Sequence, residues 1–121
     1  MDSAAAVKVI KFGGSSLADA RQFRKVKDIV KSDSSRRYVI PSAPGRRFDG
    51  DEKVTDLLYQ CYDMAVRGES IDDLFQKIMD RYDGIIRDLG LDLDLSAQYT
   101  VIKNGFLCHV GRDYAASRGE Y

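Results

Sequence analysis

The chain opens with a short apolar run that stops at two glycines. Residues 6–12 are rich in β-branched and aromatic side chains, which favour a strand: Val7, Val9, Ile10 and Phe12. Beyond the glycines, apolar positions follow the spacing of one helical face: Leu17, Ala20, Phe23, Val26, Ile29 and Val30. Ser16 and Asp19 resemble a capping box, which predicts that this helix begins at Ser16. The serine-rich segment 32–35 should end it.

A second strand is predicted at residues 38–40, where it runs into Pro41. Proline has no N–H to give to a ladder, so the strand must stop there or leave that side unpaired. Two strands that flank a helix form a β-α-β unit, which implies parallel pairing and a right-handed crossover. The polar loop 46–53 follows.

The remaining apolar positions fall at helical spacing. One apolar face runs from Val54 to Ala65, with Gly68 as the expected C-terminal cap, and a longer one runs from Ile71 to Leu89, with Gly90 as its stop. Segment 91–96 is expected to link into a helix that Gly105 interrupts, and 113–121 is compatible with a last helix. Serines are the expected caps of two of these helices: Ser70, in a capping box with Asp73, and Ser96.

The predicted fold class is α/β, rich in helix and incomplete. Two strands and five helical segments give too little sheet to bury the helical faces in a helix-sheet-helix sandwich. Parallel strands on their own also leave open edges. The chain therefore looks like part of something larger, or one that needs a partner.

Composition narrows the function classes. The 121 residues include 19 Lys and Arg and 19 Asp and Glu, so net charge gives no reason to expect nucleic acid or an anionic membrane as a partner. No apolar stretch reaches the roughly 20 residues of a membrane span. We expect no signal peptide, because Met1 to Ile10 has no long apolar run after a basic start. Cys108 and His109 are neighbours, but too few other Cys and His residues exist to complete a zinc site with them. We therefore expect a cytoplasmic protein.

The segment from Lys11 to Ser16 carries the candidate chemistry. Gly13 and Gly14 let the backbone approach a ligand closely, and the helix behind them should present free N–H groups to an anion. A buried Lys11 ammonium beside those amides would suit a phosphate, although a tight turn with a surface lysine fits the local pattern equally well. The spacing matches neither a Walker loop nor a dinucleotide fingerprint.

Four ordered blocks resemble the aspartokinases of the amino acid kinase family. They are Val9-Ile10-Lys11-Phe12-Gly13-Gly14-Ser15-Ser16-Leu17-Ala18-Asp19, Ser42-Ala43-Pro44-Gly45, Lys53-Val54-Thr55-Asp56-Leu57-Leu58 and Asp113-Tyr114-Ala115-Ala116-Ser117-Arg118-Gly119-Glu120. The resemblance covers nearly the whole chain. It implies that residues 1–121 are the N-terminal portion of a catalytic domain, with no regulatory ACT domain. Pro41 departs from it, since the family usually continues a β-branched strand there.

The resemblance also implies roles for individual residues. Lys11 is the candidate catalytic residue, and the phosphates of ATP would be bound by Lys11, Gly13, Gly14, Ser15 and Ser16. A helix cap alone would also account for Ser16. The candidate aspartate-binding residues are Thr55, Glu120 and, less directly, Ser42. Without the resemblance, Thr55 would be a residue that satisfies its own helix backbone and Glu120 a solvated charge.

The implied reaction transfers the γ-phosphoryl of ATP to the side-chain carboxylate of L-aspartate, with Mg²⁺ neutralising phosphate charge. It is the first step toward lysine, threonine and methionine. A carboxylate is already ionised at neutral pH, so no general base is needed. The second half of the domain should lie beyond Tyr121, so we expect no turnover by this chain alone and a homo-oligomer for the full-length enzyme.

Two other interpretations stay open at this point. The chain could belong to another amino acid kinase with a different acceptor, against which Thr55 and the Ser117–Glu120 block argue. It could instead be a helical interaction module that offers the Ile71–Leu89 stripe to a partner, although such a stripe is more often core.

Overall fold

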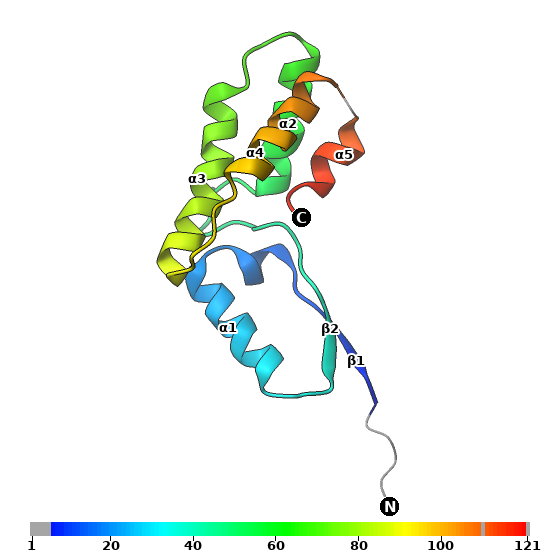
Figure 1. Ribbon diagram of the computed structural model, residues 1–121, viewed down its shortest axis with the longest axis vertical. Helices are drawn as coiled ribbons and strands as arrows, with labels where there is room; N and C mark the ends of the chain where they lie inside the picture. Colours follow the sequence, from blue (N-terminus) through cyan, green and yellow to red (C-terminus); the bar gives the residue numbers. More distant parts are fainter. Residues whose placement is uncertain (1–5, 110, 121) are drawn as a thin grey trace, which may run out of the picture.

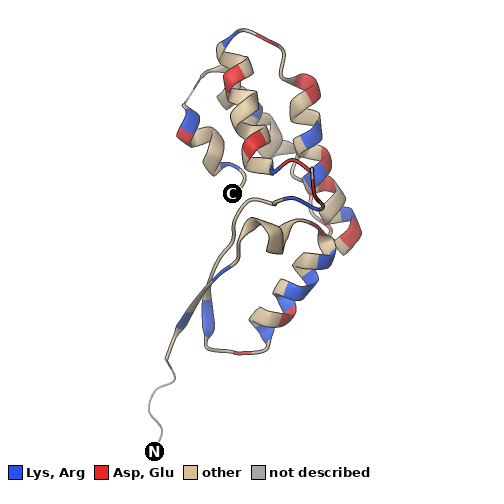
Figure 2. Ribbon diagram, turned by 180° about the vertical axis from the view of Figure 1, so that it is seen from behind, with Lys and Arg blue, Asp and Glu red and all other residues tan. Residues whose placement is uncertain are grey.

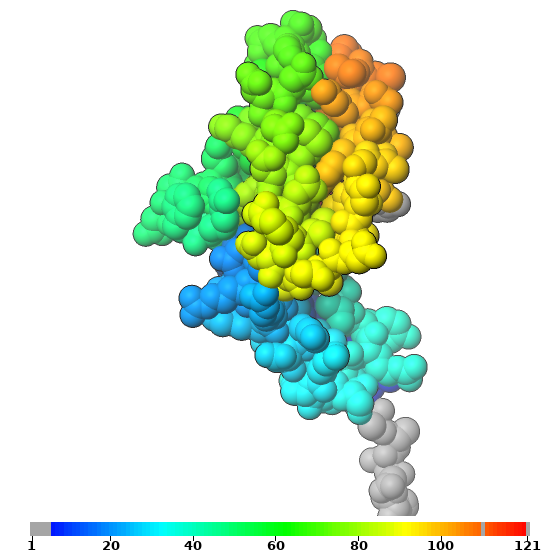
Figure 3. All heavy atoms as spheres, turned by 60° about the vertical axis from the view of Figure 1, so that its left-hand side comes forward, coloured from blue at the N-terminus to red at the C-terminus, as the bar shows by residue number. Residues whose placement is uncertain are grey.

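The computed structural model describes residues 6–109 and 111–120 and has two parts (Figure 1). The N-terminal part contains β1 (Lys8–Lys11), the 3-10 turn η1 (Gly14–Leu17), α1 (Ala20–Lys31) and β2 (Arg36–Ile40). The second part is helical and contains α2 (Val54–Val66), α3 (Asp72–Leu89), α4 (Ser96–Leu107) and α5 (Arg112–Ser117). The C-terminal end of α3 rests on α1, where Arg24 donates to the Asp88 carbonyl, and the loop 46–53 projects from the side (Figure 3).

The two strands pair in parallel, as the β-α-β pattern predicts. The register runs from Lys8 opposite Arg36 to Lys11 opposite Ile40, and β2 ends at Ile40, directly before Pro41. Large apolar side chains of this sheet stay 41–63% exposed: Val9, Tyr38, Val39 and Ile40. An α/β fold with an incomplete, uncovered sheet is therefore what the structure shows.

Helix α1 begins four residues later than predicted. Asp19 is its N-cap, in an extended conformation, and its carboxylate accepts the Gln22 N–H at 3.0 Å. Ser16 instead lies inside η1, where its N–H donates to the Gly13 carbonyl at 3.1 Å. The capping box at Ser16 was wrong because Asp19 itself caps the helix. The amides at the start of α1 consequently do not adjoin the glycine turn.

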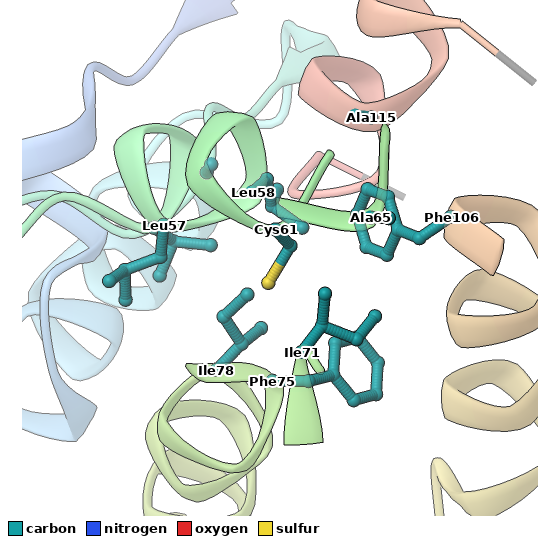
Figure 4. Packing of buried hydrophobic residues seen from close by; sticks show 11 residues of the cluster. Leu57, Leu58, Cys61, Ala65, Ile71, Phe75, Ile78, Phe106 and Ala115 are labelled. Atoms are coloured by element: carbon teal, nitrogen blue, oxygen red, sulfur yellow. The ribbon is translucent and has the colours of Figure 1, made fainter. Parts of the chain in front are cut away.

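The core lies among the four helices of the second part. The Cys61 sulfur from α2 points toward Ile71 and Ile78, and Phe75 from α3 lies on the side of Phe106 from α4 (Figure 4). The Phe75 ring meets the Phe106 ring edge-on at 6.2 Å. Because Ile71, Phe75, Ile78 and Ile85 are buried, the Ile71–Leu89 stripe is core and does not offer a partner surface.

The helix ends agree with the sequence better than the starts. Gly68 and Gly90 follow α2 and α3 with φ of 76° and 68°, the left-handed conformation that a C-terminal cap requires. Ser70 and Ser96 are not caps, since Ile71 and Leu95 occupy those positions without side-chain capping bonds. Ser70 only accepts the Asp72 N–H at 3.4 Å, and Ser96 donates its N–H to Asp94 at 2.9 Å.

Gly105 does not interrupt α4, which continues to Leu107. A Cβ at this position would lie 2.8 Å from the Tyr114 ring, so the glycine lets α5 pack against α4. Here the glycine serves packing, and the break expected from helix propensity does not occur.

The neutral net charge hides a separation of charge between the two parts. Residues 1–40 contain nine Lys and Arg against four Asp and Glu, whereas residues 41–121 contain ten against fifteen. Basic residues dominate α1, and most of the acidic ones lie on the helical part (Figure 2). Within the described ranges, no helix has the length and apolar character needed to cross a membrane.

Candidate functional site

The glycine turn packs against the loop that follows β2. The Gly45 N–H donates to the Gly14 carbonyl at 2.8 Å. A Cβ on Gly45 would lie 2.6 Å from the Gly14 carbonyl carbon, and one on Gly14 would lie 3.1 Å from the Ala43 oxygen. Both glycines are therefore required because two backbones touch. Gly13 faces open space, with nothing within 4 Å of a Cβ built there.

A cavity of about 500 Å³ opens beside this contact. Four segments of the chain line it, and it brings together five of the predicted site residues: Gly14, Ser15, Ser42, Thr55 and Glu120. The other lining residues are Ala43, Pro44, Gly45, Arg46 and Lys53. Residues from opposite ends of the sequence thus face one space.

The N-terminus of α2 adds main-chain donors to this cavity. Val54 donates its N–H to the Pro44 carbonyl at 3.1 Å, and Leu57 donates to Lys53 at 3.1 Å. The N–H groups of Thr55 and Asp56 make no hydrogen bond within residues 6–109 and 111–120. With the helix dipole and the Arg46 and Lys53 charges, this end favours an anion. The helix whose N-terminus lines the cavity is thus α2, whereas the sequence pointed to the helix after the glycines.

Thr55 and Glu120 present polar groups to the same space. The half-buried Thr55 hydroxyl makes no hydrogen bond to any described residue, so it does not satisfy its own helix backbone. Glu120 is exposed and is the only carboxylate among the lining residues, opposite two cations. A ligand with both a carboxylate and an ammonium would therefore find complementary groups here.

Glu120 is held in place through its neighbour Gly119. The Tyr82 hydroxyl donates to the Gly119 carbonyl at 2.7 Å, and burial raises the Tyr82 pKa, so the phenol stays protonated. A Cβ on Gly119 would lie 2.7 Å from the Ala43 Cβ and 3.0 Å from a Leu58 methyl. The close approach at Gly119 therefore serves protein packing.

Three predicted phosphate-binding residues do not line the cavity. Lys11 ends β1 and is exposed, so the expected burial of its ammonium was wrong for the described chain. Gly13 is exposed and Ser16 is half-buried within η1. Their roles toward ATP stay predictions.

Sequence reasoning missed Arg46, Lys53, Gly45 and Arg81. Arg46 and Lys53 are the first and last residues of the loop 46–53, which the sequence predicted only to be polar. Arg81 had a readable signal, because it lies three residues after Ile78 and four before Ile85, on the apolar face of α3. A charged residue at such a position must find partners inside the protein.

Comparison with known proteins shows which proteins the chain is similar to. No protein-family model matches it. Aspartokinase 3 of Bacillus subtilis (strain 168) is 45% identical over 85 residues, which make up 70% of this chain and 19% of that protein. The crystal structure of the aspartate kinase of Clostridium acetobutylicum superposes with a TM-score of 0.92 at 48% identity, covering 97% of this chain and 27% of that one.

The chain thus spans 19% and 27% of the lengths of these two relatives. Nearly its whole length nevertheless shares one fold with the clostridial enzyme, at an identity that indicates common descent. Both comparisons confirm the resemblance to the aspartokinases. By sequence and by fold, the chain is a homologue of the aspartate kinases and belongs to their family.

Proposed function

We propose that this chain supplies the aspartate pocket and the glycine turn of an aspartate kinase site. There, the γ-phosphoryl of ATP passes to the side-chain carboxylate of L-aspartate. The observation that supports this most strongly is the single cavity that Gly14, Ser15, Ser42, Thr55 and Glu120 line together. The relatives are named as aspartate kinases, and nothing in the site favours a different acceptor.

The cavity offers a partner for each charged group of aspartate. Glu120 pairs with the ammonium, as a carboxylate near a cation does. The Thr55 and Ser42 hydroxyls and the free amides of Thr55 and Asp56 donate to a carboxylate. Lys53 and Arg46 attract the two carboxylates of the substrate and offset the Glu120 charge.

The nucleotide side of the site is the glycine turn. The Ser15 hydroxyl and the main chain at Gly14 face the cavity, so a phosphoryl group placed there would lie next to the acceptor carboxylate. Lys11, Gly13 and Ser16 extend this surface along the chain, and Lys11 would stabilise negative charge on the moving phosphoryl group. Since the acceptor is an ionised carboxylate, positioning and charge stabilisation account for the chain's share of the chemistry.

Mg²⁺ would enter this site together with the nucleotide. No group of three or more His, Cys, Asp or Glu side chains gathers in residues 6–109 and 111–120. Mg²⁺ usually reaches kinase sites bound to nucleotide phosphates. Cytoplasmic location and a homo-oligomeric full-length enzyme stay predictions.

The proposal is tested by titrating the ¹⁵N-labelled chain with L-aspartate and, separately, with ATP and Mg²⁺ while amide shifts are recorded. L-Aspartate should shift Thr55, Asp56 and Glu120, and ATP should shift Gly14 and Ser15. Succinate, which lacks the ammonium, is the control and should leave Glu120 unshifted. Equal shifts with succinate and L-aspartate, or shifts confined to the Cys108 region, would reject the assignment. An ADP-release assay should show no aspartate-dependent turnover by the chain alone.

A further inference from the structure

Arg81 is a buried charged residue of α3, with 7% of its surface exposed, and the Asp51 side chain beside it is 8% exposed. Its Nη2 donates to the Gly45 carbonyl at 2.7 Å and to the Ala18 carbonyl at 3.0 Å, and its Nη1 donates to the Glu52 carbonyl at 3.0 Å. The Asp51 carboxylate lies 3.7 Å from Nη1. Burial lowers the Arg81 pKa, yet an arginine stays protonated at neutral pH.

These three carbonyls belong to three segments that reach the cavity. Gly45 bonds to Gly14, so Arg81 supports that contact from behind. Ala18 follows directly after η1, and Glu52 directly precedes Lys53 at the start of α2. One planar guanidinium thus fixes the glycine turn, the proline-glycine loop and the α2 N-terminus relative to one another.

The next residue of α3 supports the fourth segment. Tyr82 donates to the Gly119 carbonyl at 2.7 Å, and this bond sets the place of Glu120 at the other side of the cavity. Neither Arg81 nor Tyr82 lines the cavity. Consecutive residues of one helix therefore reach all four lining segments without facing the ligand space.

We infer that Arg81 and Tyr82 are positioning residues with separate tasks. Arg81 shapes the glycine turn on the phosphate side together with the α2 end of the aspartate pocket, whereas Tyr82 shapes only the Glu120 side of that pocket. The inference rests on the proposed function for the identity of the two ligands, but its geometric part does not. Arg81 acts through its fork of donors, which lysine cannot reproduce, and Tyr82 acts through a single hydroxyl.

The test uses Arg81→Lys and Tyr82→Phe in the ¹⁵N-labelled chain. Each variant has a matched control that changes a like group away from the cavity. Arg87→Lys alters an exposed arginine of the same helix, paired with Asp88. Tyr99→Phe removes a tyrosine hydroxyl that donates to Asp83 at 2.8 Å.

Amide hydrogen exchange tests, without any ligand, whether Arg81 supports the contact between Gly45 and Gly14. Arg81→Lys should speed exchange at the Gly45 amide by about tenfold, the equivalent of one hydrogen bond. The core amides of Cys61 and Ile78 report whether the variant is folded, and the Gly45 effect should exceed theirs. Unchanged relative protection of Gly45 would overturn the role of Arg81.

Titration with each ligand tests which binding affinity depends on Arg81 and which depends on Tyr82. Arg81→Lys should weaken the binding of both ATP with Mg²⁺ and L-aspartate by about tenfold, whereas Tyr82→Phe should weaken L-aspartate binding by about tenfold and leave ATP binding nearly unchanged. The two controls should leave both affinities unchanged. Equal loss of both ligands in Tyr82→Phe, unchanged ATP affinity in Arg81→Lys, or losses matched by the controls would overturn the inference. If the unmodified chain bound neither ligand while Gly45 exchange still rose, the proposed function would fail and the geometric role of Arg81 would stand.

Discussion

The backbone N–H of Gly45 donates to the carbonyl oxygen of Gly14 at 2.8 Å, which places the loop after β2 directly on the loop after β1. The contact joins the two strand ends just where the cavity begins. It depends on the absence of side chains, since a Cβ on Gly45 would meet three backbone atoms of Gly14 and Ser15 within 2.8 Å.

Gly45→Ala should therefore destabilise the chain and displace the glycine turn. Backbone atoms cannot swing aside as a flexible side chain does, so we expect a loss of about 1–3 kcal/mol in the free energy of unfolding, measured by urea titration. Gly84→Ala is the matched control, because a Cβ there meets only the Arg87 side-chain tip at 3.6 Å. Inside α3 that change should stabilise by up to about 1 kcal/mol. Equal behaviour of the two variants would contradict the argument.

Local patterns predicted those parts of the fold that depend on local forces. Gly68 and Gly90 ended their helices, because a left-handed residue is needed wherever a helix closes in this way. The predicted N-caps Ser16, Ser70 and Ser96 were wrong. Several polar residues stand close together at each of these helix starts, and the sequence pattern cannot rank them as caps. Asp19 caps α1 in place of Ser16, because its carboxylate accepts the Gln22 N–H.

The site could be predicted only as far as the family resemblance carried it. Spacing cannot reveal that Gly45 touches Gly14 or that Glu120 faces Thr55, since both are long-range contacts. Arg81 was visible as a charge on an apolar helix face, but its three carbonyl partners come from distant loops. Lys11 was misjudged because the described sheet has only two strands to cover it.

Thr55→Val should weaken L-aspartate binding by about tenfold, because it removes a hydroxyl that would bond to a charged group and keeps the side-chain volume. Amide-shift titration measures the affinity. Thr100→Val is the control, since that hydroxyl donates to the Ser96 carbonyl at 3.1 Å on α4 and does not line the cavity. Unchanged affinity in Thr55→Val, or an equal loss in Thr100→Val, would remove Thr55 from the site.

Asp51 should make stability depend on acid pH. Its carboxylate accepts from the Arg47 side chain at 2.7 Å, and this bond above all holds the Asp51 pKa well below its usual range. A depressed pKa contributes stability above the unfolded-state value of about 3.9, and that contribution is lost as pH falls toward the folded value.

Asp51→Asn should thus lower the free energy of unfolding, measured by urea titration, most at pH 7, by about 2 kcal/mol. The difference from the native chain should narrow below about pH 4. Asp49→Asn, an exposed change in the same loop, is the control and should have a small effect at every pH. A gap between the native chain and Asp51→Asn that widened on acidification would refute the stated sign.

The two cysteines should differ sharply in reactivity. Cys61 is fully buried in the helical core, and burial raises the pKa of its thiol to about 12, whereas Cys108 is exposed. Disulfide reagents attack the thiolate, so at pH 8 one thiol per native chain should react quickly and the second only in denaturant. Cys108→Ser should abolish the fast phase and leave the slow one intact. Fast reaction of both thiols in the native chain would mean that α2 and α3 separate readily, which the packing of Cys61 against Ile71 and Ile78 argues against.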